Sequence, residues 1–257
     1  MYISEFRDVE LMNEGRSRRR ERTSYGRPVR NTILLEIPEQ EFRIVQPALE
    51  FVNLDVGMAL QREGGHIEAA YFLNRGIASM LVSTSDGKSV EVGISGYEDM
   101  IGLPLAGGLT EFTHTVLMQI PGDGFRIEAR AMERIVGSLP DLQRLLVRRL
   151  AVRSILQAQN AGCNRLHDVK KRIARWLLVT HDRLDSHVII TTHDSLSKMV
   201  GTDRATVTVA IADLEQIGII ARGRASISIT NRRKLERLSC ECYALFKRFN
   251  PELGLRD

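Results

Sequence analysis

The chain has 257 residues, of which 43% are hydrophobic and 26% charged, and its formal net charge is +4. This composition is that of an ordinary water-soluble protein, and the length allows two domains. No run of about eighteen apolar residues occurs, so we expect no membrane-spanning helix, and the acidic, polar start does not resemble a secretory signal. Three cysteines give no disulfide framework, which predicts a cytoplasmic protein.

Residues 1–30 are polar and rich in arginine, with Arg16, Arg18, Arg19, Arg20 and Arg22 almost adjacent. Like charges this close repel one another in any fold, which predicts a disordered basic tail. Two interpretations of this tail remain open. It has no function, or it adds non-specific contacts to DNA phosphates.

The segment 31–137 is expected to form a compact antiparallel β-domain. A short helical pattern over 31–48 is stopped by Pro47. The sequence then consists of short runs rich in Val, Ile, Leu and aromatic residues. These runs cover 48–61, 69–84, 88–96 and 114–122. Asp86-Gly87 lies between two of them and favours a hairpin turn. Several strands linked this way predict a barrel or jelly roll with few open edges.

A long helix is predicted over 138–163, because this stretch contains no helix breaker between Pro140 and Gly162. Ser138 and Asp141 resemble a capping box at its start, where Pro140 is tolerated. An approximate heptad seam favours a parallel homodimer, with a monomeric core helix as the alternative. The seam consists of Leu142, Leu145, Arg149, Val152 and Leu156.

The segment 164–235 has the layout of a winged helix-turn-helix, followed by a C-terminal helix or tail over 236–257. Asp168 can cap a first helix, and two further amphipathic helices meet at Gly201. The helix pair alone is equally typical of two ordinary antiparallel helices. After Gly218, however, two β-branched runs surround Arg222 and Arg224, as in a basic two-stranded wing. This order of elements favours DNA binding, with the second helix of the pair in the major groove.

These elements, in this order, resemble the CRP/FNR family of bacterial transcription regulators over residues 31–235. DVGMALQREGGHIEAAYFLNRGIASMLVSTSDGKSVEVGISGYEDMIGL resembles the family's cyclic-nucleotide-binding-like sensor domain, and THDSLSKMVGTDRATVTVAIADLEQIGII resembles its DNA-binding domain. CNRLHDVKKRIARWLL and the later CECY resemble one subgroup, whose effector the resemblance does not imply.

The resemblance implies an α+β fold class with an N-terminal antiparallel β-roll, a long dimerisation helix and a C-terminal winged helix-turn-helix. It also implies double-stranded DNA, a second copy of the chain and RNA polymerase as partners, together with an unidentified small-molecule effector. A hinge is expected between Gly162 and Asp168, through which the sensor domain would bias the spacing of two recognition helices. We expect no enzyme, because no nucleophile elbow or phosphate-cradling loop occurs.

The sequence departs from the family members that bind cyclic AMP. In those proteins a Gly-Glu pair offers a carboxylate to the ribose, and an Arg-Ser/Thr-Ala run binds the phosphate. Here Leu103 follows Gly102, and the later stretch reads EFTHTV without an arginine. His114, within it, could give a weaker phosphate contact or simply be packed. We therefore expect no cyclic AMP in the usual mode.

No metal or other cofactor is expected either. The N-terminal tail lacks the cysteines that hold an iron–sulfur cluster in redox-sensing relatives, and Cys240 and Cys242 lie far along the chain from Cys163. Two residues apart on a helix, Cys240 and Cys242 would point to different sides. For Cys163, near the expected two-fold axis, an intersubunit disulfide and a plain buried thiol both remain open. The group around His181 and His187 meets no zinc spacing.

With Asp203 as the cap of the recognition helix, one face of that helix is predicted to meet DNA bases, and Arg204 on it is the strong candidate for a guanine. This face consists of Arg204, Ala205, Thr208 and Val209. Contacts to phosphates are expected from Thr192, Ser195, Lys198, Thr206, Arg222 and Arg224. A competing interpretation is a ligand-binding or interaction module that keeps a vestigial helix-turn-helix.

Overall fold

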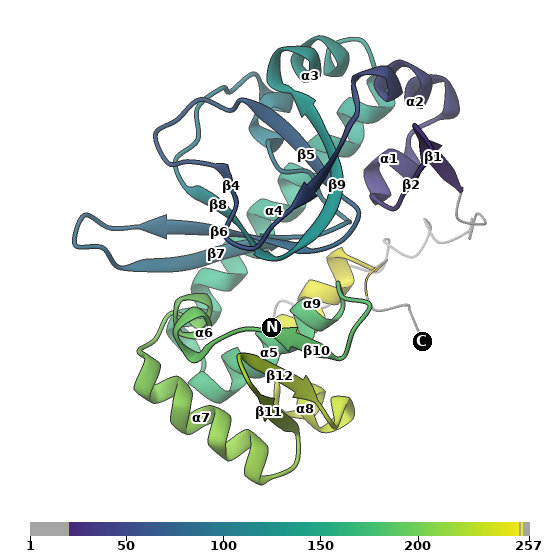
Figure 1. Ribbon diagram of the computed structural model, residues 1–257. Coiled ribbons are helices and arrows are strands. Elements are labelled where there is room, and N and C mark those ends of the chain that lie inside the picture. Colours follow the sequence, from purple (N-terminus) through teal and green to yellow (C-terminus); the bar gives the residue numbers. More distant parts are fainter. Residues whose placement is uncertain (1–20, 252, 254–257) are drawn as a thin grey trace, which may run out of the picture.

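The computed structural model describes residues 21–251 and 253, and its N-terminal half is an antiparallel β-domain built from two sheets (Figure 1). One sheet has the strand order β3-β9-β5, and the other has the order β4-β8-β6-β7. Their bounds are Glu50–Leu54 (β3), Ala59–Gln61 (β4), Ala69–Leu73 (β5), Ile77–Ser83 (β6), Ser89–Ser95 (β7), Thr115–Ile120 (β8) and Gly122–Glu128 (β9). The predicted antiparallel β-roll is therefore confirmed.

The core of the β-domain comes from the β-branched, aliphatic and aromatic positions of these strands, among them Phe72, Phe125 and Met118, which are fully buried. The hairpin expected at Asp86-Gly87 joins β6 to β7. Gly87 lies there at a φ of +81°, a conformation that glycine adopts without strain.

The expected disordered tail is wrong for its last residues, because the chain is folded from Arg22 onward. β1 (Arg22–Ser24) and β2 (Arg27–Val29) form a hairpin, followed by the short helices α1 (Thr32–Glu36), α2 (Glu39–Val45) and η2 (Gln46–Ala48). The buried guanidinium of Arg22 donates to the Ile37 carbonyl at 2.7 Å. A charge predicted to lie in the disordered tail therefore serves as a structural donor. Arg16, Arg18, Arg19 and Arg20 lie outside the described residues.

After η3 (Leu103–Gly107) and α3 (Ala129–Val136), the long helix α4 spans Pro140–Leu166. The expected capping box is wrong: Ser138 donates to the carbonyl of Ile135, and a distant carboxylate caps the helix instead. Glu41 accepts from the backbone N–H groups of Asp141 at 2.9 Å and Leu142 at 2.8 Å. A negative charge at this end also complements the helix dipole.

Helix α4 does not end at Gly162, as expected, but continues one further turn to Leu166. The break before the next helix is therefore at His167, and Asp168 caps that next helix through the N–H of Lys171 at 3.0 Å. The junction expected between Gly162 and Asp168 is shorter than predicted.

The heptad seam expected on α4 faces the chain's own domains. Leu142 and Leu145 belong to the core of the β-domain, and Leu156 packs against the core of the C-terminal domain. The opposite side of α4 leaves Val147 52% and Ile155 41% exposed. Together with Ala151 and Ala158, which are also exposed, these residues form a stripe at helical spacing along α4, the 147–158 stripe.

The C-terminal domain is a helix-turn-helix with a three-stranded wing. Its sheet has the order β10-β12-β11, so the expected two-stranded hairpin gains a third strand, β10, from residues 188–190. The elements are α5 (Val169–His181), β10 (Val188–Ile190), α6 (His193–Val200), α7 (Arg204–Gln216), β11 (Ile220–Gly223), β12 (Ser226–Ile229), α8 (Arg232–Leu238) and α9 (Cys242–Phe249). Trp176 of α5 is buried in the core of this domain. None of the helices in the described part of the chain is long and apolar enough to cross a bilayer.

Candidate nucleic-acid interface

Helix α7 carries the face that the sequence predicts to contact DNA, and the orientation of that face is fixed by burial and by the helix cap. Val207, Ala210, Ile211 and Leu214 are buried, as their spacing predicts. Asp203 accepts from the N–H of Thr206 at 2.8 Å, which satisfies one of the free donors at the helix start. These two constraints turn the opposite face of α7 outward.

The outward face of α7 holds the four residues that the sequence predicts for base contact. Arg204, Ala205 and Thr208 are exposed, and Val209 is 61% exposed. The Thr208 hydroxyl donates to the Arg204 carbonyl at 2.9 Å, which leaves its methyl group as the outer surface. Val209 is not buried by any other described part of the chain, whereas apolar contact with a thymine methyl would bury it. The face therefore offers one guanidinium surrounded by small apolar groups.

Helix α6 lies against α7, and the turn between them is set by Gly201 at a φ of +62°. Two of the residues expected to contact phosphates are engaged with each other at the start of α6. Thr192 caps the helix by accepting from the N–H of Ser195 at 3.1 Å, and the two hydroxyl oxygens are 3.0 Å apart. Lys198, in the last turn, pairs with Asp194 at 3.2 Å while remaining half exposed.

The remaining hydroxyl candidate, Thr206, also serves the helix start: it donates to the second carboxylate oxygen of Asp203 at 2.6 Å. The charge of Asp203 stands beside the outward face, and these hydrogen bonds from Thr206 hold its pKa below the usual value. The hydroxyl groups at both helix starts are therefore oriented by caps rather than free to rotate.

The wing presents its two arginines differently. Arg222, in β11, is ion-paired with Glu215 of α7, whose pKa the hydrogen bonds from Arg222 lower. Arg224 lies in the turn between β11 and β12, and it is exposed with no ion pair to any described residue. A freely exposed guanidinium at a hairpin tip is suited to a phosphate.

His193 is a further residue of this surface that the sequence analysis missed. It is the first residue of α6, and its Nδ1 lies 3.0 Å from the Thr208 hydroxyl oxygen. Partial burial, followed by the nearby charges of Arg222 and Arg204, lowers its pKa. His193 lines a groove with Arg204 and Arg222 between α6, α7 and the wing. Its position directly after the helix cap Thr192 was the available signal.

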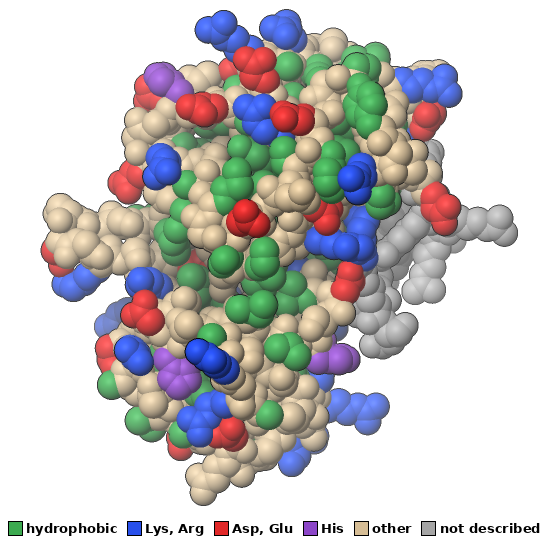
Figure 2. All heavy atoms as spheres, in the orientation of Figure 1, with side chains coloured by type: hydrophobic (Ala, Val, Ile, Leu, Met, Phe, Trp, Pro, Cys, Tyr) green, Lys and Arg blue, Asp and Glu red, His purple; other side chains and the backbone are tan. Residues whose placement is uncertain are grey.

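Figure 2 shows that the surface of the C-terminal domain carries a mixture of charges rather than one basic patch. Lysine and arginine side chains are interspersed with acidic ones in the lower half of the molecule, around α6, α7 and the wing of Figure 1. The Glu215–Arg222 and Asp194–Lys198 pairs account for part of this mixture.

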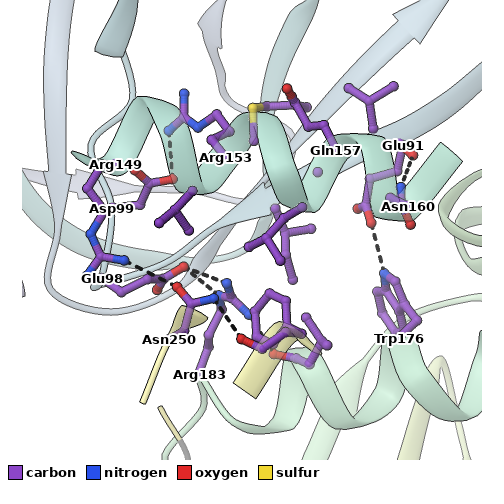
Figure 3. A pocket seen from close by; sticks show the side chains of 18 of the residues that line it. Glu91, Glu98, Asp99, Arg149, Arg153, Gln157, Asn160, Trp176, Arg183 and Asn250 are labelled. Carbon is purple, nitrogen blue, oxygen red and sulfur yellow. Dashed lines mark hydrogen bonds and ion pairs between the residues drawn. The ribbon is translucent and has the colours of Figure 1, made fainter. Parts of the chain in front are cut away.

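The β-domain meets the C-terminal domain at a cavity lined by β7, α4, α5 and α9 (Figure 3). Glu91 of β7 accepts from the Trp176 indole at 3.1 Å, and Glu98 pairs with the buried Arg183 at 2.9 Å. Asp99 pairs with Arg153 of α4 at 2.7 Å. Burial acts to raise the pKa of Asp99, but the charge and hydrogen bond of Arg153 hold it below its usual value. Ionic contacts thus join the two domains.

The residues predicted from the sequence to stand at the positions of the cyclic AMP contacts pack within the chain's own β-domain. Leu103 is fully buried in the β-domain core. The ring of His114 contacts that of Phe112 at a tilt of 52°, with the ring centroids 4.2 Å apart, and burial lowers the pKa of His114. The packed alternative for His114 is therefore the one that the structure has.

The arrangement of the three cysteines differs from the one predicted from the sequence. Cys240 precedes α9 and only Cys242 belongs to it, so the two thiols do not diverge as they would on one helix. Both turn toward Cys163, which lies 3.6 Å from Cys240 and is only 1% exposed. Cys163 is thus buried within its own chain, which agrees with the buried thiol of the two alternatives. With His167 these thiols form the one cluster among the described residues with the donor set of a metal site. The i, i+4 spacing of Cys163 and His167 was the missed signal.

Comparison with known proteins agrees with this geometry. Residues 171–238 match the family model described as a Crp-like helix-turn-helix domain. The structure resembles FixK2 from Bradyrhizobium japonicum, with a TM-score of 0.65 and 18% identity over 75% of this chain and 98% of that one. The chain has the CRP/FNR fold, with a Crp-like helix-turn-helix domain.

Other structures of the CRP/FNR fold resemble the chain to a similar degree. A transcriptional regulator of the crp/fnr family from Eubacterium rectale gives a TM-score of 0.63 at 16% identity, over 79% of this chain and 95% of that chain. The c-di-GMP-responsive regulator CLP of Xanthomonas campestris gives 0.62 at 15% identity, over 75% and 99%. None of the curated proteins compared with the chain matches it.

Proposed function

We propose that this CRP/FNR-type chain is a sequence-specific DNA-binding transcription regulator and not an enzyme. The observation that carries the proposal is the outward face of α7. Arg204, Ala205, Thr208 and Val209 all stand exposed on the helix that a winged helix-turn-helix inserts into the major groove. Arg204 is exposed and unpaired among the described residues, so it has no evident structural role, whereas beside methyl-bearing side chains it suits contact with bases.

The base contacts that we propose follow from the chemistry of this face. Arg204 would donate two hydrogen bonds to O6 and N7 of a guanine, while Ala205, Val209 and the Thr208 methyl would contact thymine methyls. Arg224 and, once released from Glu215, Arg222 would contact phosphates, as would Lys198 and the cap residues Thr192, Ser195 and Thr206. The site would then contain one critical G·C pair flanked by thymines.

We further propose that the regulator is a homodimer, assembled through the 147–158 stripe rather than through the seam expected from the sequence. Val147, Ala151, Ile155 and Ala158 are exposed along one side of α4, and their small size would allow two helices to approach closely. A two-fold dimer would bind a palindrome whose half-sites lie about 34–36 Å apart. RNA polymerase and an effector at the cavity between the domains are further proposed partners.

A binding titration of the full chain against DNA from upstream of its own gene tests the proposal. We expect salt-sensitive binding that prefers a palindromic sequence, unchanged by cyclic AMP because the usual contact residues are missing. Binding without preference for any sequence, compared with a scrambled duplex of equal length, would support the interaction module with a vestigial helix-turn-helix instead.

A further inference from the structure

The end of α4, the turn before α9 and the start of α9 bring together three thiols and an imidazole. The ligand atoms of Cys163, His167, Cys240 and Cys242 all lie within 4.8 Å of one another. The three cysteines form a small buried cluster separate from the two main cores. We propose that these four residues bind a single zinc ion, which ties α9 to the junction between the long helix and the DNA-binding domain.

The distances fit a mononuclear tetrahedral site. With zinc–sulfur bonds of about 2.3 Å, the sulfurs of a tetrahedral site stand about 3.8 Å apart, and a sulfur and a nitrogen slightly less. Cys163 and Cys240 are 3.6 Å apart at their sulfurs, and the Cys242 sulfur lies 3.6 Å from Nδ1 of His167. Two opposite edges of the tetrahedron are therefore already in place. A multi-iron cluster would need its ligand sulfurs further apart.

The surrounding groups are those that a metal-bound histidine and thiolate require. The Nδ1 of His167 faces the sulfurs, while its Nε2 lies 3.1 Å from a carboxylate oxygen of Glu241. A carboxylate on the second nitrogen fixes the tautomer that leaves Nδ1 free to coordinate. Gln159 donates to the Cys242 sulfur at 3.0 Å, which stabilises negative charge there.

The local charge also favours a thiolate site. Three thiolates, one neutral imidazole and Zn²⁺ carry a net charge of about −1. The charges of Arg172 and Arg175 act on Cys163 from α5 and offset that excess. Three cysteines and one histidine leave no open coordination position, which is typical of a structural zinc site rather than a catalytic one.

The site would act at the junction expected to be a hinge. His167 is the residue after the last turn of α4, and Asp168 caps α5 immediately beyond it. A zinc ion would therefore fix the angle between α4 and the DNA-binding domain by holding both to α9. This proposal goes beyond DNA recognition and does not depend on it, because metal binding is measured without DNA.

Elemental analysis of the full chain, purified under reducing conditions without chelator, tests the site directly. We expect one zinc per chain, and cobalt substitution should give the absorption of a tetrahedral thiolate complex. Cys242→Ser should weaken zinc binding at least about tenfold, and Glu241→Gln should weaken it by a similar factor through His167. His66→Gln, which removes an exposed histidine elsewhere, should leave the metal content unchanged.

A second variant separates loss of metal from loss of folding. His167→Cys should retain one zinc in a four-cysteine site, whereas His167→Ala should lose affinity. A zinc-free protein with three reactive thiols, a Cys163–Cys240 disulfide in place of metal, or iron with inorganic sulfide would each overturn the proposal.

Discussion

Trp176, a buried residue of the DNA-binding domain, donates its indole N–H across the domain boundary to Glu91 of strand β7, at 3.1 Å. Ser79 donates to the other carboxylate oxygen of Glu91 at 2.7 Å. Glu91 is fully buried, and this burial raises its pKa to about 7, although Ser79, Arg175 and Trp176 act in the opposite direction. A buried carboxyl group with a raised pKa therefore makes one of the contacts between the two domains.

The raised pKa of Glu91 predicts a pH-dependent stability. Between the pKa of the unfolded chain, about 4.3, and that of the folded chain, the folded state binds more protons. The free energy of unfolding should therefore fall as the pH rises through this window, by about 3 kcal/mol from Glu91, and level off about one unit above the folded pKa. Urea unfolding at pH 5 and pH 7.5 measures this fall.

Glu91→Gln isolates the contribution of that carboxyl from other titrating groups. The amide keeps an acceptor for Trp176 but has no charge to bury, so the variant should gain stability relative to the parent at pH 7.5 and much less at pH 5. An equal difference between parent and variant at both values would contradict the assignment.

The buried ion pair of Glu98 and Arg183 predicts a strongly non-additive pair of substitutions. Both side chains are almost fully buried, so removing one partner leaves an uncompensated charge. We expect Arg183→Met and Glu98→Met each to cost about 3–5 kcal/mol, and the double variant to cost less than either. Glu50→Gln breaks the exposed pair with Arg126 and should cost about 1 kcal/mol or less. Additive losses would contradict this account.

The 147–158 stripe predicts the oligomeric state. Ala158→Glu should convert the dimer into a monomer, because a carboxylate would be buried between two helices, and sedimentation velocity measures the change. Ala244→Glu makes the same change at an exposed position of α9, away from the stripe, and should leave the dimer intact. A dimer that survives Ala158→Glu but dissociates in Leu156→Glu, with the fold preserved, would return the interface to the seam expected from the sequence.

Removing Arg224 and releasing Arg222 from its ion pair with Glu215 should have opposite effects on DNA affinity. Arg224→Ala should weaken binding evenly across sequences and reduce the salt slope by about 0.9. Glu215→Gln should strengthen binding, because it removes a negative charge and releases Arg222 for a phosphate. Fluorescence anisotropy at several salt concentrations distinguishes the two. A Glu215→Gln variant with weaker binding would mean that the ion pair positions Arg222 for DNA.

The fold could be predicted from the sequence because its signals are local. The alternation of the β-strands, the apolar face of α7 and the Asp203 cap depend only on neighbours along the chain, and each has its expected place. The start of α4 could not be predicted in the same way, since its cap is Glu41, a hundred residues earlier. The burial of Leu142 and Leu156 likewise depends on which domains α4 touches.

The cysteine site shows the same limit. Cys163 and Cys240 are 77 residues apart, and their meeting depends on α9 folding back onto α4. Spacing along a single helix was the wrong test for Cys240 and Cys242, because the chain turns between them. A pair of cysteines combined with a Cys-x-x-x-His on another helix was the pattern that could have indicated convergence.

Selection of bound duplexes from a random pool, with the parent chain and Arg204→Ala in parallel, tests the central claim most directly. The parent should select a palindrome with one dominant G·C pair in each half-site and thymines beside it. Arg204→Ala should lose preference at that pair alone, by about 1–3 kcal/mol, while the half-site spacing stays the same. A parent chain that selects no sequence, or an Arg204→Ala variant that selects the same guanine as the parent, would contradict the account.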